Sequence, residues 1–256
     1  MSTTRRVTAL SATLFAVLGS AAPGVAAAAP AFVNAPMQVS AAGSHHMLAQ
    51  GGGIRNSTSS NWSGYAATGA KFTSVSASWV QPTGHCTSAT TYSSFWIGLD
   101  GDGSNSVEQT GSEVDCSGGS PQYYAWYEMY PAYPVNFPGK VRPGDHFTSS
   151  VTESGSGSFT LKLSDTTQGW SKTVTKTLRN AALASAEVIA EAPSSSSGVL
   201  PLTNFGTASF TSATANGQPI GNFSPDNITM ASGSTTKATT SGLSGGNAFS
   251  VTWKHS

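Results

Sequence analysis

The sequence predicts an all-β protein, a single-domain antiparallel β-sandwich of the jelly-roll or concanavalin-like kind. Several short segments alternate apolar with polar residues, which is the period-two pattern of half-buried strands. Clusters of Gly, Pro, Ser and Asn separate these segments, as expected for turns between strands. Together the segments occupy about two hundred residues without a visible repeat, a length that suits one sandwich rather than two domains.

The clearest alternation occurs in two segments, at residues 74–79 and 159–163. Serines separate the apolar residues of the first segment, and Thr160 and Lys162 separate those of the second. Because successive side chains of a strand point to opposite faces, one face of each segment is expected to meet the core. Shorter runs of similar character are residues 171–178, 208–211, 227–230 and 249–253. The apolar positions are Val75, Ala77, Trp79, Phe159, Leu161 and Leu163.

Residues 180–192 are ambiguous between helix and strand. Their composition favours a helix, because helix formers dominate the segment and Pro193 follows it. In a strand, by contrast, Glu187, Ile189 and Glu191 would share one face. These residues by themselves leave both conformations open.

The first 29 residues have the features of a secretory signal peptide. Arg5 and Arg6 precede an apolar stretch, and small residues up to Ala29 suit cleavage. A membrane anchor is the alternative, but polar residues interrupt the stretch, and it is shorter than the ~20 apolar residues that a span needs. We therefore expect a secreted protein with no membrane association after cleavage. The arginine pair leaves the export route open between the general and twin-arginine systems.

Residues 30–55 contain no acid and no clear period, so they are interpreted as a linker or short pro-segment, and residues 56–256 as the β-sandwich domain. Removal of residues 1–29 leaves ten of the twelve basic residues against twelve acids. This balance gives no electrostatic basis for binding nucleic acid, and we expect a monomer. Only 9% of the residues are charged, so little stability depends on ion pairs that acid would break.

The two cysteines, Cys86 and Cys116, are expected to form a disulfide, because the protein is predicted to be exported. The bridge would close a loop of about thirty residues, for which chain entropy predicts roughly 3–4 kcal/mol of stabilisation. No Cys-His signature surrounds either residue, so a reactive thiol is the weaker interpretation.

The carboxylates that could carry chemistry are few. All twelve acids follow residue 99, and six of them are glutamates. Glu113 lies in a polar stretch that we interpret as a loop, and Glu153 lies in a Gly-Ser segment, so both are expected to be solvated. Period two points Glu108 and Gln109 to opposite faces, so only one of them can face a given cleft.

Four segments stand out along the chain: Phe95-Trp-Ile-Gly-Leu-Asp-Gly101, Val107-Glu-Gln-Thr-Gly111, Tyr123-Tyr-Ala-Trp-Tyr-Glu-Met-Tyr-Pro131 and Ala186-Glu-Val-Ile-Ala-Glu191. In this order they resemble the glutamic peptidases, the eqolisin family of secreted acid proteases. The resemblance extends over roughly residues 56–253, and it favours a strand over residues 186–192, which we expect. It implies a peptidase that acts on polypeptides without a cofactor or metal.

The resemblance implies that Gln109 and Glu191 are the catalytic residues. Peptide hydrolysis by water needs a base, a donor to the oxyanion and an acid for the departing amine. Glu191 would act as the base and then as the acid, while Gln109 would position the water and donate to the oxyanion. A free glutamate titrates near pH ~4.3, so a glutamate base is best matched to acidic conditions.

The same resemblance implies a substrate cleft lined by aromatic residues and supported by two acids. Large aromatic side chains suit an extended peptide because they bury much area with few rotatable bonds; their alternative role is packing in the sandwich core. In the family the aromatic segment often reads Asp-Ala-Trp-Tyr-Glu, whereas this chain has Tyr124 at the first position, so one acid of the cleft is missing. The predicted cleft residues are Trp62, Trp96, Asp100, Trp126, Glu128 and Tyr130.

Two other functions are compatible with these residues. A jelly-roll glycosidase could use Glu128 and Glu191, with the carboxyl groups about 5–5.5 Å apart for retention or about 6.5–9.5 Å for inversion. That function has no use for Gln109. A lectin-like module could use the aromatic residues as a binding platform without catalysis.

Three weaker patterns point to other chemistry. Gly242-Leu-Ser-Gly-Gly246 fits G-x-S-x-G, but it lacks a strand-to-helix context. Residues 100–105 hint at a calcium loop without its glycine and final glutamate, so a turn is favoured. The five histidines show no zinc spacing. We therefore expect no metal site.

Overall fold

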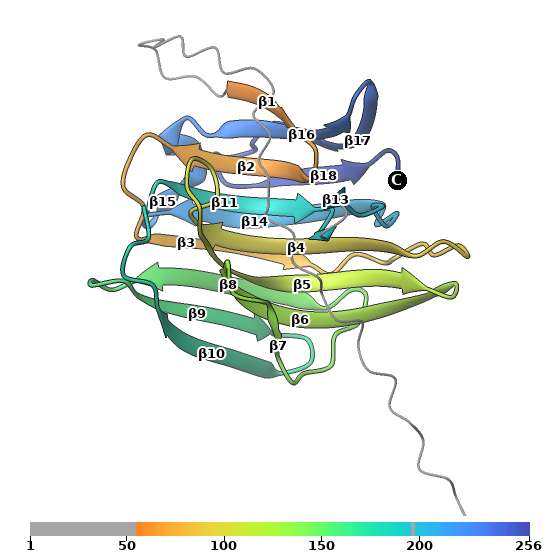
Figure 1. Cartoon of the computed structure of the whole chain (residues 1–256), viewed down its shortest axis with the longest axis horizontal. Helices are drawn as coiled ribbons and strands as arrows, with labels where there is room; N and C mark the ends of the chain where they lie inside the picture. Colours follow the sequence, from red (N-terminus) through yellow and green to blue (C-terminus); the bar gives the residue numbers. More distant parts are fainter. Residues whose placement is uncertain (1–54, 196–197) are drawn as a thin grey trace, which may run out of the picture. The chain divides into compact units, whose positions relative to one another are not determined.

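The computed structural model describes residues 55–195 and 198–256 (Figure 1). In this part of the chain it contains eighteen strands and one short 3-10 helix, η1 (Ile220–Phe223), which confirms the predicted all-β class. The expectations for residues 1–29 and 30–54 lie outside the described residues. Arg55, predicted as the end of the linker, begins the first strand.

The strands are short, and most are bounded by turns rich in glycine. Those of the first half are β1 (Arg55–Ser59), β2 (Trp62–Thr68), β3 (Ser74–Val80), β4 (Thr91–Leu99), β5 (Val107–Ser117), β6 (Ser120–Tyr130), β7 (Val135–Asn136), β8 (His146–Glu153) and β9 (Ser158–Asp165). Those of the second half are β10 (Trp170–Thr177), β11 (Ser185–Glu191), β12 (Ser194–Ser195), β13 (Gly198–Val199), β14 (Thr207–Ala215), β15 (Gln218–Pro219), β16 (Asp226–Ser232), β17 (Thr235–Thr240) and β18 (Phe249–Trp253).

Hydrogen bonds connect most of the strands into one path, in the order β10-β9-β8-β3-β14-β18-β17-β16-β2-β11-β4-β5-β6-β7. Neighbours along this path are antiparallel, whereas β1 joins β16 in parallel. The path folds over on itself, so that β4, β5 and β11 pack against β3, β8, β9 and β14. Figure 1 shows strands of both halves running along a common direction, as in an aligned β-sandwich.

The hydrophobic core lies between the two layers and takes side chains from both. Trp79 on β3 stacks on Phe147 of β8 with ring centroids 5.6 Å apart. Its indole nitrogen donates a hydrogen bond of 2.8 Å to the hydroxyl of Ser112 on β5 in the other layer. A buried indole N–H needs such a partner, because leaving it unpaired costs free energy. Trp79 therefore links the two layers by packing and by polar contact.

The alternating segments form strands with the predicted faces. In β3 the apolar positions are buried and the intervening serines are only partly buried, and β9 repeats the pattern with Phe159, Leu161 and Leu163 inside. The alternation follows from the pleat of the backbone, which turns successive side chains to opposite faces. This part of the sequence prediction is confirmed.

The segment with helical composition forms strand β11, as the family resemblance implied. β11 pairs with β2 on one side and β4 on the other, and each of its residues is buried. Hydrogen bonds to the two neighbouring strands pair the backbone N–H and C=O groups that a helix would pair within itself. Tertiary pairing therefore overrides the intrinsic helix propensity of the alanines.

The predicted disulfide joins Cys86 to Cys116, with a Cα–Cα distance of 5.3 Å. It links the loop before β4 to the end of β5, and Cys116 is fully buried. Among residues 55–195 and 198–256, no helix is long and apolar enough to cross a membrane.

Candidate active site

One face of the layer formed by β2, β11, β4, β5 and β6 points away from the core and carries most of the predicted site residues. Strand register arranges its side chains in cross-strand rows, because alternate residues of each strand share a face. The first row contains Trp62, Glu191, Ser94, Glu113 and Tyr124. The second contains Gly64, Ile189, Trp96, Gly111 and Trp126, and the third contains Ala66, Glu187, Gly98, Gln109 and Glu128.

Glu191 is the last residue of β11 and is only 4% exposed. Its Oε1 accepts a hydrogen bond of 3.1 Å from the side-chain amide of Asn61, and its Oε2 accepts one of 2.7 Å from the indole nitrogen of Trp96. Burial raises the pKa of Glu191 to about 8; the charge of Glu128 adds to this, whereas the bonds from Trp96 and Asn61 oppose it. The carboxyl group is thus held in one orientation by two buried donors.

Gln109 lies on β5, directly opposite Glu128 on β6, and both side chains are buried. The amide nitrogen of Gln109 donates a hydrogen bond of 2.6 Å to Oε2 of Glu128. Burial raises the pKa of Glu128 to about 7, and the bond from Gln109 opposes that rise. The amide therefore has a defined orientation, which an oxyanion donor requires before the reaction begins.

The predicted aromatic residues gather on the same face, in a cluster separate from the sandwich core. Trp62 meets Trp96 edge to face, with ring centroids 5.1 Å apart and an interplanar angle of 75°. Trp126 is 5% exposed, while Tyr130 is half-buried at the end of β6. The structure thus brings these four aromatic residues together with Gln109, Glu128 and Glu191.

Asp100 is placed differently from the other predicted residues. It is fully buried directly after β4, with a left-handed φ of 66°. Its two carboxyl oxygens accept hydrogen bonds of 2.9 and 2.7 Å from the backbone amides of Leu183 and Ala184. These bonds attach the β4–β5 turn to the segment that leads into β11. Asp100 therefore anchors a loop, and its carboxyl group is turned to the backbone instead of toward a ligand.

The prediction for Glu113 was wrong. It does not lie in a solvated loop: β5 continues to Ser117, and Glu113 is 1% exposed in the row of Glu191. Asp115, also buried, and Tyr124 lie beside it, and the Tyr124 hydroxyl donates to Asp115. The polar sequence suggested a loop, but period-two counting from Gln109 through residues 111, 113 and 115 would have found this face.

Asn61 is a second residue that sequence reasoning did not assign to the site. It precedes β2, is fully buried, and binds Glu191 from 130 positions earlier in the chain. The available signal for this contact was that Asn61 precedes Trp62, the residue that pairs with Glu191 across β2 and β11. An isolated asparagine before a tryptophan does not by itself indicate such a contact.

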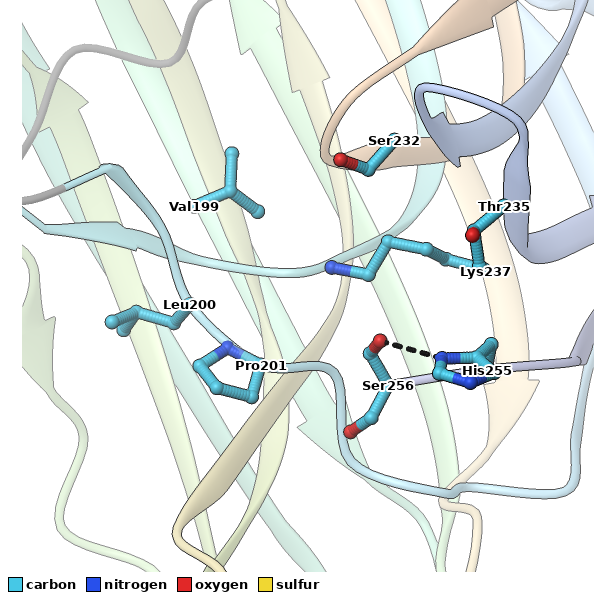
Figure 2. A pocket seen from close by; sticks show the side chains of 8 residues that line it. All are labelled: Val199, Leu200, Pro201, Ser232, Thr235, Lys237, His255 and Ser256. Atoms are coloured by element: carbon cyan, nitrogen blue, oxygen red, sulfur yellow. Dashed lines mark hydrogen bonds between the residues drawn. The ribbon is translucent and has the colours of Figure 1, made fainter.

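A pocket of about 380 Å³ lies elsewhere on the domain and contains none of the predicted site residues (Figure 2). Lys237 reaches into it with only 7% of its surface exposed, and burial lowers the pKa of its ammonium group. Among residues 55–195 and 198–256, no group of three or more His, Cys, Asp or Glu side chains could hold a metal ion. The pocket is lined by Val199, Leu200, Pro201, Ser232, Thr235, Lys237, His255 and Ser256.

Comparison with known proteins identifies relatives over the domain. The model of the Peptidase A4 family matches residues 60–253. Aspergillopepsin-2 from Aspergillus niger is 32% identical over 135 residues, which cover 50% of this chain and 48% of that protein. Scytalidopepsin B from Scytalidium lignicola is 37% identical over 117 residues, 44% of each protein. The chain thus spans about half the length of the curated relatives it matches.

Solved structures support the same relationship. Scytalido-glutamic peptidase, crystallised with a transition state analog inhibitor, aligns with a TM-score of 0.63 and 26% identity over 76% of this chain and 98% of that chain. Aspergilloglutamic peptidase from Aspergillus niger aligns with a TM-score of 0.57 and 25% identity over 64% and 99%. The resemblance to glutamic peptidases is confirmed, as is the β-sandwich fold. With a family match over residues 60–253, the chain belongs to the Peptidase A4 family.

Proposed function

We propose that this protein is a secreted endopeptidase that hydrolyses unfolded polypeptides at acidic pH through Gln109 and Glu191. One observation carries the proposal: an amide and a carboxyl group share an aromatic-lined sheet face, and each is oriented by a buried hydrogen bond. One relative adds support, because scytalido-glutamic peptidase has been crystallised with a peptide based transition state analog. The signal-like residues 1–29 support export.

The reaction follows from the two groups. The ionised carboxyl group of Glu191 removes a proton from water, and the water oxygen forms a bond to the scissile carbonyl carbon. The electron pair of the C=O double bond moves to the oxygen, and the Gln109 amide donates a hydrogen bond to this oxyanion. The oxyanion then re-forms the double bond, the C–N bond breaks, and the nitrogen takes the proton from Glu191. The products are a carboxylic acid, an amine and the restored carboxylate.

Two opposing effects set the pH range of this reaction. Burial raises the pKa of Glu191 to about 8, so the expectation that this base titrates like a free glutamate near pH ~4.3 was wrong. The fraction of ionised base instead increases with pH throughout the acidic range. Folded protein substrates, in contrast, unfold and expose their backbone mainly in acid. Activity on folded proteins is therefore highest at acidic pH, where the substrate is unfolded and the low charge of this chain preserves its own fold.

The test is cleavage of one protein in two forms, native and reduced with blocked thiols, from about pH 2 to 8. We expect both forms to be cleaved at acidic pH, and the unfolded form to remain a substrate at higher pH, where the native form resists cleavage. Glu191→Gln should abolish most product formation, and Gln109→Ala should lower kcat by about 10²–10³. Glu153→Gln, a substitution on β8 in the other layer, is the matched control and should cleave normally.

Mass spectrometry of the products decides the reaction class. Peptides with new termini that depend on Glu191 would support the endopeptidase. Cleavage that persists in Glu191→Gln would show that Glu191 is not the catalytic base. Products from polysaccharides, with none from proteins, would favour the glycosidase instead.

A further inference from the structure

A second acidic cluster lies on the same face as Glu191 and has no role in the reaction proposed above. It consists of Glu113 and Asp115 on β5 and Tyr124 on β6, which pairs with Glu113. Glu113 is 1% exposed and Asp115 is 2% exposed. The Tyr124 hydroxyl donates a hydrogen bond to Oδ2 of Asp115. Since side chains two residues apart on a strand point the same way, the carboxyl groups of Glu113 and Asp115 lie close enough to share a proton.

Glu113 also lies in the row of Glu191. Ser94 on β4 pairs with Glu191 on one side and with Glu113 on the other. Neighbouring strands lie ~4.8 Å apart, so the two glutamate Cα atoms are separated by roughly 10 Å. Ser94 is buried and small, which lets the two longer side chains approach each other above it. Glu113 therefore lies between two other acids, Asp115 on its own strand and Glu191 across β4.

The three acids differ in how readily they ionise. Burial raises the pKa of Asp115 to about 6, and the hydrogen bonds from Tyr124 and Glu113 oppose that rise. Burial also raises the pKa of Glu113 well above its ordinary value, and the charges of Asp115 and then Glu191 add to the rise. Within the described residues, the other titratable groups that face these acids are Tyr92 on β4 and Glu128 on β6.

We propose that Asp115 and Tyr124 are positioning residues that keep Glu113 protonated. Glu191, rather than Glu113, is then the carboxyl group that becomes negatively charged. Asp115, which the tyrosine hydroxyl stabilises as a carboxylate, ionises first of the three acids and then accepts a hydrogen bond from protonated Glu113. Glu191 then ionises beside a neutral neighbour. A carboxyl group at position 124 would add another negative charge, whereas the tyrosine supplies a neutral donor. The proposal rests on the role of Glu191 as the catalytic base.

The first test measures the titration of each glutamate carboxyl group by ¹³C NMR of protein labelled at the glutamate Cδ atoms. The chain contains six glutamates, so each resonance can be assigned by substitution. Asp115→Asn removes the charge that retains the proton while keeping an acceptor for Tyr124. We expect Glu113 to titrate at lower pH and Glu191 at higher pH than in the unaltered protein, each by about one pH unit. An unchanged titration of Glu113 would overturn the proposal.

The second test is the pH profile of kcat/KM with a short peptide substrate. In Asp115→Asn the acidic limb should move to higher pH by about one pH unit. In the double variant Asp115→Asn, Glu113→Gln, the side chain at position 113 cannot ionise. The acidic limb of kcat/KM should then return to its original pH or move below it. A merely structural role predicts the opposite, a loss at every pH that becomes larger in the double variant. Glu153→Gln serves again as the control on the other layer.

The two tests also separate this proposal from the proposed function. The NMR titration does not require peptidase activity, so the coupling between Glu113 and Glu191 can be measured even if no substrate is cleaved. Absence of any cleavage that depends on Glu191 would reject the proposed function. Cleavage with an unmoved limb in Asp115→Asn would reject only the positioning role.

Discussion

The side-chain amide of Gln109 donates a buried hydrogen bond of 2.6 Å to Glu128, its direct partner across β5 and β6. This contact leads to the first prediction. Glu128→Ala removes the acceptor, so the amide loses its orientation and kcat should fall by roughly tenfold or more, with little change in KM. Glu128→Gln retains an acceptor oxygen and should lose much less.

Both Glu128 variants share a second effect, because the charge of Glu128 raises the pKa of Glu191. Removing that charge should lower the pKa of Glu191, so the acidic limb of kcat/KM should move to lower pH in each. Steady-state kinetics over pH separates the two effects. Equal losses of kcat in the two variants would contradict the orienting role.

The second prediction concerns stability and pH. Several carboxyl groups are buried with raised pKa values: Glu108 to about 8, Asp115 to about 6, Glu128 to about 7 and Glu191 to about 8, with Glu113 and Glu187 raised well above the ordinary value. A carboxyl group whose folded pKa exceeds its unfolded value stabilises the fold fully below the unfolded pKa, near ~4, and loses that contribution as pH rises through the folded pKa.

The free energy of unfolding should therefore be highest near pH ~4 and fall steadily toward pH 8. Each carboxyl group that is protonated in the folded state but ionised in the unfolded state adds to this fall. Urea unfolding at pH 4, 6 and 8 measures the slope. Glu187→Gln, which buries a neutral group at the same position, should make the slope shallower. A protein equally stable at pH 4 and 8 would disprove the prediction.

The third prediction concerns the glycine beside Trp96. A Cβ atom at Gly111 would lie 2.3 Å from the Phe95 carbonyl oxygen and 2.6 Å from Cβ of Trp96. Gly111→Ala should therefore displace β4 and the indole that holds Glu191, lowering stability by about 1–3 kcal/mol and lowering kcat as well. Gly242→Ala is the matched control, because nothing lies within 4 Å of its added Cβ. Urea unfolding and kinetics of the two variants provide the comparison.

The fourth prediction concerns the buried cation of the separate pocket. Lys237 is largely buried, and desolvation lowers the pKa of its ammonium group, because removing a charge from water costs free energy. Lys237→Met keeps the length of the side chain without the charge, and should raise the free energy of unfolding by on the order of 1 kcal/mol. Lys254→Met, at an exposed position, should leave stability unchanged. A less stable Lys237→Met would indicate that the charge stabilises the fold.

The sequence carried enough information to predict the strand faces, because period-two alternation is a local consequence of the pleated backbone. It also carried the candidate residues Gln109 and Glu191, through segments that resemble a known family. The local composition of β11 favours a helix and does not predict its strand conformation. That conformation depends on pairing with β2 and β4, whose residues lie more than eighty positions away.

The cysteine pairing, the alternating strands and the family were thus determined by the sequence by itself. Only the tertiary structure decided which residues face one another. Asn61 and Trp96 donate hydrogen bonds to Glu191, and Asp100 accepts one from the backbone before β11. Glu113 lies in the same cross-strand row as Glu191. The physical reason is register. Cross-strand neighbours are set by how distant strands align, and a residue's burial and pKa depend on those neighbours rather than on the adjoining residues of the chain.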